Sequence, residues 1–349
     1  VICNGSTTTG VTFTGNVAGT VYNWSNTNTA IGLGASGVGD IASFVTTNTT
    51  NATISGTITA TPIYTNAGLG CTGTPISFTI TVNPIPTVNA VSNQTICVGG
   101  STTVVTPTGF VPGTVYNWTS SNTAIGLAAS GTGNIPSFVT TNTGNTPISS
   151  TITITPTYTN GGVSCSGAPV TFTITVNPIP TVNGVNNQVI CNGSTTTGVT
   201  FTGNVAGTVY NWSNSNTAIG LGASGVGNIA SFVTTNTTNA TISGTITATP
   251  VYTNAGLGCT GTPTTFTIAV NPIPTVNAVA NQTICVGGST TLVTPTGNVV
   301  GTVYNWTSSN TAIGLAASGT GNIPSFVTTN TGNTPISSTI TITPTYTNG

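Results

Sequence analysis

The chain has 349 residues, with one acidic side chain, no Lys, Arg or His, and a formal net charge of −1. About a quarter of the residues in an ordinary globular protein are charged. This composition therefore excludes almost all acid–base catalysis, because no Ser or Cys nucleophile has a side-chain base and no oxyanion has a cation. It also excludes a basic surface for nucleic acid and a carboxylate cage for a metal, so we expect no enzyme and no cofactor.

One pentapeptide, Thr-Val-Tyr-Asn-Trp, organises the chain in four copies, and their tryptophans are 94 residues apart. Its Tyr and Trp stand two positions apart, so on an extended strand both side chains project from one face. A face with two large aromatic residues is expected in a core. The predicted core residues are Tyr22, Trp24, Tyr116, Trp118, Tyr210, Trp212, Tyr304 and Trp306.

The expected elements of the first repeat follow in chain order. Residues 7–14 are rich in β-branched and aromatic side chains and predict a strand. The Tyr-Trp strand follows and ends at Trp24, and residues 41–45 predict a further strand. Between these two lies the Gly-rich stretch 30–39, which predicts a loop or an irregular edge strand because so many glycines disfavour a helix.

This Gly-rich stretch contains one match to the dinucleotide fingerprint GxGxxG, at Gly32, Gly34 and Gly37. The fingerprint requires a preceding parallel strand, a following helix and an acidic residue about 20 positions later. The pattern supplies none of these, and the second repeat has Ala128 at the middle glycine. We therefore interpret the glycines as backbone positions. Asp40, the only acid, is replaced by Asn in the other repeats and is interpreted as a solvated substitution.

Two amphipathic strands close each domain. In the second repeat they are residues 150–158 and 170–176, in which apolar residues alternate with Thr. Such alternation predicts one buried and one solvated face. Cys165 is expected in the loop between the two strands.

The seven cysteines form two series with the same 94-residue period. The series are Cys3, Cys97, Cys191 and Cys285, and Cys71, Cys165 and Cys259. Members of one repeat are 68 residues apart (71 − 3), so the simplest pairing is one disulfide within each repeat, with the partner of Cys285 expected at position 353. A disulfide framework implies an oxidising, extracytoplasmic compartment. Metal-binding thiols are the alternative, but no CxxC pair or His completes a zinc site.

The segment Val-Asn-Pro-Ile-Pro separates the repeats. Its prolines fix φ and remove hydrogen-bond donors, so the strand ladder must stop there and the backbone is held extended. The predicted inter-domain joints are Pro84, Pro86, Pro178, Pro180, Pro272 and Pro274. The predicted domains are 1–85 and 274–349, each truncated, and the complete repeats 86–179 and 180–273. No run of about 18 apolar residues could span a bilayer, and we expect a window of a longer secreted protein.

The order Cys, Tyr-x-Trp, Cys, the repeat length and the proline joints resemble the PKD-like, immunoglobulin-like tandem repeats of giant secreted surface adhesins of gliding bacteria (Bacteroidota). The most specific parts are residues 115–118, 125–131 and 151–156. A typical PKD domain has an aromatic residue and a Gly-Asp-Gly turn after the Trp, whereas this chain has Thr-Ser-Ser-Asn, so the resemblance is to the PKD-like branch. It implies a β-sandwich, export by a dedicated secretion system, and a role in attachment or motility, with no catalytic residues.

These observations predict an all-β tandem array of immunoglobulin-like sandwiches with one disulfide each. The predicted function is a structural segment of an extracellular filament or a cell-surface adhesin stalk, whose partners are other copies of itself. Neutral Thr, Asn and Ser faces repel one another little, and no charged residue guards the strand edges. Two alternatives stay open: a carbohydrate-binding module that uses the Tyr and Trp side chains as a platform for surface glycans, and ice binding by ranks of Thr.

Overall fold

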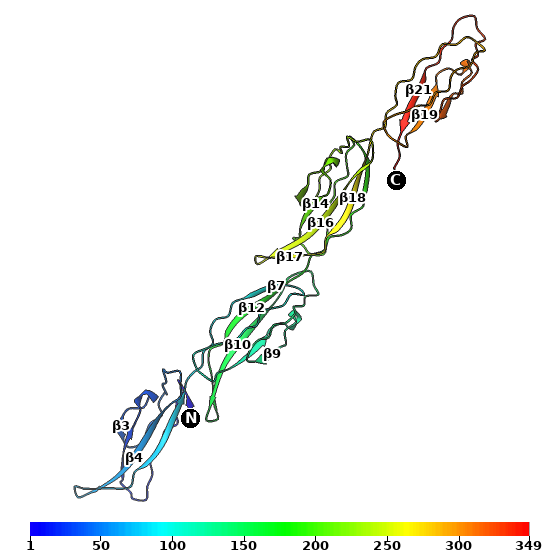
Figure 1. The fold of residues 1–349 in the computed structure, drawn as a ribbon. Helices are drawn as coiled ribbons and strands as arrows, with labels where there is room; N and C mark the ends of the chain where they lie inside the picture. Colours follow the sequence, from blue (N-terminus) through cyan, green and yellow to red (C-terminus); the bar gives the residue numbers. More distant parts are fainter. Residues whose placement is uncertain (349) are drawn as a thin grey trace. The chain divides into compact units, whose positions relative to one another are not determined.

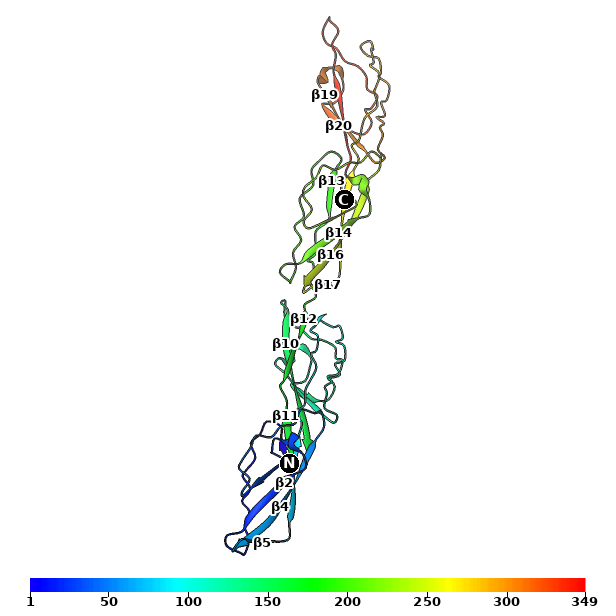
Figure 2. The ribbon, with the colours of Figure 1, turned by 90° about the vertical axis from the view of Figure 1, so that its left-hand side faces the viewer.

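The computed structural model describes residues 1–348 (Figures 1 and 2). The chain divides into two compact units. Unit 1 comprises Val1–Pro178 together with Asn254–Leu257, and unit 2 comprises the remaining described residues. We call the predicted domains 1–85, 86–179, 180–273 and 274–349 repeats 1 to 4; these boundaries stay a prediction. No helix among the described residues is long and apolar enough to span a membrane.

Each repeat contributes one sheet, and every sheet draws its strands from a single repeat. Repeats 1 to 3 share the strand order that in repeat 1 reads β1-β6-β4-β2-β3, with β5 paired to β4. The strands of repeat 1 are β1 (Ile2–Cys3), β2 (Val21–Asn26), β3 (Ser36–Val38), β4 (Ile54–Asn66), β5 (Leu69–Thr72) and β6 (Ile76–Asn83). Those of repeat 2 are β7 (Gln94–Cys97), β8 (Val115–Ser120), β9 (Ser130–Thr132), β10 (Ile148–Asn160), β11 (Val163–Ser166) and β12 (Val170–Asn177).

Unit 2 repeats this design. The strands of repeat 3 are β13 (Gln188–Cys191), β14 (Val209–Asn214), β15 (Ser224–Val226), β16 (Ile242–Asn254), β17 (Leu257–Thr260) and β18 (Thr264–Asn271). Repeat 4 has β19 (Val303–Ser308), β20 (Ser318–Thr320) and β21 (Ile340–Thr345). The predicted all-β class and tandem sandwich architecture are confirmed, apart from the expectation of one disulfide in each domain.

The central strand of each sheet is longer than the alternation of apolar residues indicated. In repeat 2 the predicted strand 150–158 is part of the 13-residue β10. β10 pairs antiparallel with β8 and β12 over its first part and with β11 over its last part. Its inward side chains, such as Ile152 and Ile154, are fully buried while the intervening Thr residues are not. The extension beyond residue 158 carries the β10–β11 hairpin, which places Cys165 on a strand and not in the predicted loop.

The predicted strands 7–14 and 41–45 are not continuous strands. They are joined by two isolated bridges, Thr7 to Val45 and Val11 to Ile41. Between the bridges the Thr8 hydroxyl accepts a hydrogen bond from the Phe44 N–H at 3.0 Å, so a side chain replaces a backbone acceptor. The ladder of backbone hydrogen bonds is interrupted at this point, as expected where a Thr hydroxyl competes for backbone groups. The same pattern recurs in all four repeats.

The core of each repeat lies between the sheet and this irregular layer. Fully buried Ile side chains dominate it, for example Ile58 and Ile152. All eight predicted core aromatics are buried or partly buried. Trp118 and Trp306 are each 4% exposed, and burial raises the pKa of the Tyr116 and Tyr210 hydroxyls.

The three glycines of the GxGxxG match have separate structural roles. Gly32 closes a short 3₁₀ helix, Thr29–Ile31, and its φ of 98° is left-handed. Gly37 lies against the indole of Trp24, so a Cβ there would overlap the ring. Gly34 is in open space near Ser36, which explains why repeat 2 accepts Ala128. This helix was not predicted, because its capping residue Asn28 lies in a polar stretch that is typical of a turn. The Asn28 side chain accepts a hydrogen bond from the Ala30 N–H at 3.1 Å.

Asp40 is exposed and accepts a hydrogen bond from the backbone. Its carboxylate oxygen accepts a hydrogen bond from the Phe13 N–H at 2.9 Å, and Asn228 makes the same bond to Phe201 at 3.0 Å. The exposure of Asp40 agrees with its interpretation as a solvated substitution, and its hydrogen bond is an additional finding. Repeats 2 and 4 have Pro107 and Pro295 at the donor position and cannot form this bond.

The contact between glycine and indole generates a test in repeat 3. We expect Gly225→Ala to destabilise the repeat by about 1–3 kcal/mol, because a Cβ would overlap the Trp212 ring and overpacking costs this much. Thermal unfolding followed by tryptophan fluorescence measures the effect. The matched control is Gly222→Ala, where nothing lies within 4 Å of the added Cβ. Equal effects of the two substitutions would contradict the assigned role.

Candidate functional site: the disulfide-bonded joint

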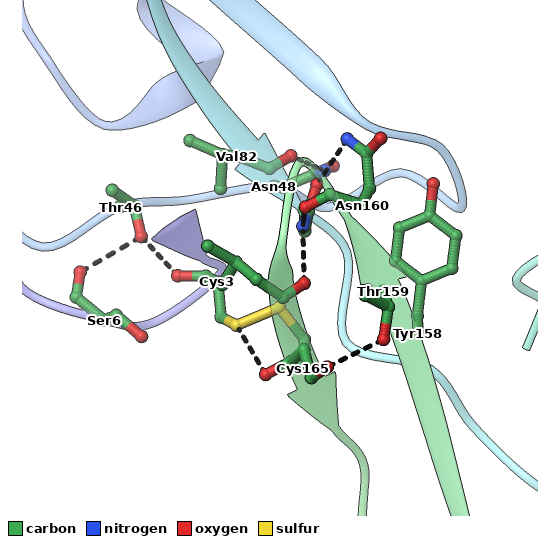
Figure 3. The surroundings of a disulfide bond; sticks show 12 residues. Cys3, Ser6, Thr46, Asn48, Val82, Tyr158, Thr159, Asn160 and Cys165 are labelled. Carbon is green, nitrogen blue, oxygen red and sulfur yellow. Dashed lines mark hydrogen bonds between the residues drawn. A yellow bond between two sulfur atoms is a disulfide. The ribbon is translucent and has the colours of Figure 1, made fainter. Parts of the chain in front are cut away.

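In unit 1, a disulfide and a group of hydrogen-bonded polar side chains lie where repeats 1 and 2 meet (Figure 3). Cys3 at the end of β1 forms a disulfide with Cys165 on β11, with an S–S distance of 1.98 Å and a Cα–Cα distance of 5.6 Å. The two cysteines are 162 residues apart in the sequence. Cys165 is 1% exposed, whereas Cys3 is half-buried. The bond therefore joins the end of one repeat to the hairpin of the next.

This connectivity corrects the predicted disulfides. Cys165 pairs with Cys3 and not with Cys97, and Cys71 is free and exposed. Cys191 is also free and exposed, so it does not pair with Cys259, which is itself disulfide-bonded. The remaining cysteines divide in the same way, with Cys97 disulfide-bonded and Cys285 free and exposed.

The long hairpin explains why the intradomain pairing is wrong. β1 pairs parallel with β6 so that Cys3 lies opposite Asn83, the last residue of β6. β10 and β11 run past the ends of the neighbouring strands of their sheet, and Cys165 lies opposite Tyr158 on this extension. A cysteine on the hairpin is thus carried away from the start of its own repeat and toward the end of the preceding one.

A network of neutral hydrogen bonds surrounds the disulfide. The Asn83 side chain is fully buried, and its Nδ2 donates to the Asn160 carbonyl at 3.1 Å and to the Val163 carbonyl at 3.4 Å. Asn160 Nδ2 donates in return to Asn83 Oδ1 at 3.0 Å. The hydroxyls of Thr53 and Tyr158 are 3.1 Å apart. Buried amides satisfied in both directions fix one geometry, because any displacement would leave a polar group unpaired.

The same polar contacts recur along the chain. Within unit 1, Asn254 Nδ2 donates to Asn177 Oδ1 at 2.8 Å, and Asn177 Nδ2 donates to the Asn254 carbonyl at 3.3 Å. Within unit 2, the hydroxyls of Thr241 and Tyr346 are 3.3 Å apart, and Asn348 Nδ2 donates to Thr241 at 3.0 Å. The joint is therefore a repeated device and not a peculiarity of one pair.

The predicted proline joints lie beside this network. The strands β6, β12 and β18 end at Asn83, Asn177 and Asn271, each immediately before the first proline of its segment. The second proline packs inward: in repeat 2 a Cβ on Gly167 would overlap the carbonyl oxygen of Pro86. The peptide connection, the disulfide and the amide network thus hold the two repeats of unit 1 together at one place.

Sequence reasoning missed the amide and tyrosine contacts of the joint. A signal was present, because Asn83 is the Asn of the repeated Val-Asn-Pro motif, and Tyr158 and Asn160 belong to a repeated Tyr-Thr-Asn. Hydroxyls and amides of this kind can hold two surfaces together but supply no catalytic base. Among the described residues, no group of three His, Cys, Asp or Glu side chains gathers to hold a metal ion.

The structure bears on the Trp half of the aromatic platform that the carbohydrate alternative used. The Trp side chains pack into the core clusters, and the indole nitrogens are buried. A glycine covers each ring, at positions 37, 131, 225 and 319.

No protein-family model matches the chain, and no curated protein matches it. Among solved structures, it is similar to Sidekick-1 immunoglobulin domains 1–5, with 11% identity and a TM-score of 0.32, over 87% of this chain and 66% of that one. Mouse protocadherin-24 EC1–3 gives 16% identity and a TM-score of 0.32, over 78% and 96%. The protocadherin gammaB7 EC3–6 cis-dimer structure gives 11% and 0.33, over 94% and 93%. The sequence identity and the TM-score are low in each case.

The disulfide connectivity can be checked by counting thiols. We expect a thiol-specific alkylating reagent to label three cysteines of the native, non-reduced chain, namely Cys71, Cys191 and Cys285, and all seven after reduction and unfolding. Intact-mass spectrometry counts the labels. Intradomain pairing would instead leave Cys285 alone to be labelled, so a single label would contradict the joint.

Proposed function

We propose that the chain is a non-enzymatic structural segment of an extracellular filament or adhesin stalk that carries tension between its ends. The observation that carries this proposal is the Cys3–Cys165 bond, which covalently joins neighbouring repeats in addition to the peptide chain. A stalk gains a joint that does not open under load.

The position of the bond determines how tension passes through unit 1. A pull on the N-terminus reaches Cys3 after three residues and then crosses the S–S bond to Cys165. The chain between these two cysteines, including most of both repeats, is closed in a loop and cannot be extended. In the chain-entropy model, closing a loop of this size stabilises the folded state by about 5 kcal/mol. Unfolding within the loop therefore cannot lengthen the stalk.

The neutral surface supports association of copies, our proposed partners, on a bacterial cell surface. The edge strands β3 and β15 expose Val38 and Val226, at 70% and 69%; Asp40 follows β3, whereas the neutral Asn228 stands at the same place after β15. Edges without charged residues can pair with another copy. The resemblance to surface adhesins supports a role in attachment or motility, and the disulfides support an extracellular location because they persist in oxidising compartments.

The load-bearing role predicts a large effect of reduction in single-molecule force spectroscopy on the chain held by its two ends. Reduction should lengthen the fully extended chain by at least about 570 Å, because it releases the 162-residue loop at ~3.5 Å per residue. Cys71→Ser, which removes a free thiol, is the control and should change nothing. If oxidised and reduced chains reach the same extended length, the bond bears no load.

A second prediction concerns salt. Because the Thr, Asn and Ser faces proposed to meet between copies are neutral, NaCl from very low to molar concentration should not dissociate assembled fibres. Sedimentation together with electron microscopy measures this, and a fibre of a charged protein serves as the comparison. Dissociation by NaCl alone would show that charge, and not neutral surface contact, holds the copies together.

A further inference from the structure

The tip of the β10–β11 hairpin, which belongs to the joint of unit 1, carries an Asn-Gly sequence at Asn160 and Gly161 (Figure 3). Asn160 ends β10 and lies opposite Val163, so residues 161 and 162 form a two-residue turn. Both are glycines with positive φ, 58° and 77°, as such turns favour. An Asn before a Gly loses its side-chain amide more readily than before any other residue, because glycine has no Cβ to keep its backbone nitrogen away from the Asn Cγ.

This loss of the amide, deamidation, consumes one molecule of water and needs no catalyst. The Gly161 backbone nitrogen attacks the Asn160 Cγ, the Cγ–Nδ2 bond breaks, and the amide leaves as ammonia with the proton of the Gly161 N–H. The five-membered cyclic imide that results is opened by water at one of its two carbonyl carbons. Attack at Cγ gives aspartate, and attack at the main-chain carbonyl gives isoaspartate, in which the chain runs through the side chain.

The closed joint holds the Asn160 amide away from this reaction. Its Nδ2 donates to Asn83 Oδ1 at 3.0 Å and to the Thr53 hydroxyl at 3.4 Å, while Asn83 Nδ2 donates to the Asn160 carbonyl at 3.1 Å. Attack by the Gly161 nitrogen requires the amide to turn back toward its own main chain. That turn breaks both bonds of Nδ2 next to the fully buried Asn83 side chain, where a hydrogen bond is costly to lose. We therefore expect deamidation to be slow while the joint is closed.

A second contact within unit 1 has the same pair of hydrogen bonds without the reactive sequence. Asn254 Nδ2 donates to Asn177 Oδ1 at 2.8 Å, and Asn177 Nδ2 donates to the Asn254 carbonyl at 3.3 Å. The residue after Asn254 is Ala255, which has a left-handed φ of 49°. Its Cβ hinders the approach of its backbone nitrogen to the Asn254 Cγ. The two amides therefore make the same contact but differ in chemical stability, which provides a control within the chain.

We propose that Asn160 is a deamidation site that the closed joint protects and that reacts once the joint opens. The carboxylate formed at position 160 has no donor for Asn83 Oδ1, and it places a charge beside a fully buried amide. Isoaspartate also adds one carbon to the main chain, which disturbs the pairing of position 160 with Val163. Either product prevents the joint from closing as before. An opening that outlasts the reaction thus becomes permanent, and this inference goes beyond the load-bearing role because it needs only the contacts of the joint.

The test follows deamidation of the whole chain at neutral pH. Each event adds one negative charge to a chain of net charge −1, so ion-exchange chromatography separates the products, and mass spectrometry of peptic fragments locates them. In the folded chain we expect Asn160 to react several-fold more slowly than in the chain unfolded by urea. Asn83→Ala removes the partner of the amide and should raise the rate toward the unfolded value. Asn4 precedes Gly5 and accepts a hydrogen bond from the Asn48 N–H, outside this contact, so it should stay slow.

Exchanging the residues that follow the two amides sharpens the result. Asn177→Ala removes the partner of the amide in the second contact, where we expect no deamidation because Ala255 follows. Gly161→Ala, added to Asn83→Ala, should lower the rate of the first amide to that of the second, and alanine already adopts the left-handed turn at position 255. Ala255→Gly, added to Asn177→Ala, should make the second amide reactive.

An equal rate at Asn160 in the folded and unfolded chain, no acceleration by Asn83→Ala, or equal acceleration at Asn4 would each overturn the proposal. Reclosure is a further check. After reduction and reoxidation, the unmodified chain should return to three labelled cysteines, whereas the deamidated chain should keep Cys3 and Cys165 labelled as well. Full recovery of the deamidated chain would contradict the permanent opening. None of these measurements applies force, so a failure here is distinguishable from a failure of the load-bearing function.

Discussion

The constraint on which the rest of unit 1 depends is the covalent bond between Cys3 and Cys165, made across the boundary of two repeats. Each repeat has its own core, so tandem sandwiches would ordinarily be free to reorient about a linker. Here the long hairpin of one repeat reaches the end of the preceding repeat, and the disulfide, the buried Asn83 amide and the proline segment act at the same place. A sandwich fold thereby becomes an element that transmits tension.

The chain builds this joint almost without charge. Where other proteins use ion pairs, it uses amides that donate and accept at once, as Asn83 and Asn160 do. Such contacts depend little on salt, because screening acts on charges. At the Asp40 position, too, a neutral side chain serves, because Asn228 of repeat 3 accepts the same hydrogen bond that Asp40 accepts in repeat 1. Neutrality also leaves strand edges unguarded, which suits a protein that associates with copies of itself.

Glycine has an unusually specific role in this fold. Gly37 and its counterparts allow the sheet to pass directly over an indole, and Gly167 and its counterparts allow the proline segment to pass over the hairpin. In both places a Cβ would overlap its neighbour, so close approach and not flexibility accounts for the residue.

The sequence by itself determined the all-β class, the fourfold repetition, the buried Tyr-Trp face and the near-absence of charged side chains. These follow from local periodicity and composition, which act at short range. Only the tertiary structure decided the partner of Cys165, because spacing along the chain does not reveal how far a hairpin extends beyond its sheet. It also decided that residues 7–14 form bridges and not a strand, since a Thr8 hydroxyl takes the place of a backbone acceptor. Contacts between repeats depend on which surfaces meet in space, and a one-dimensional pattern does not encode this.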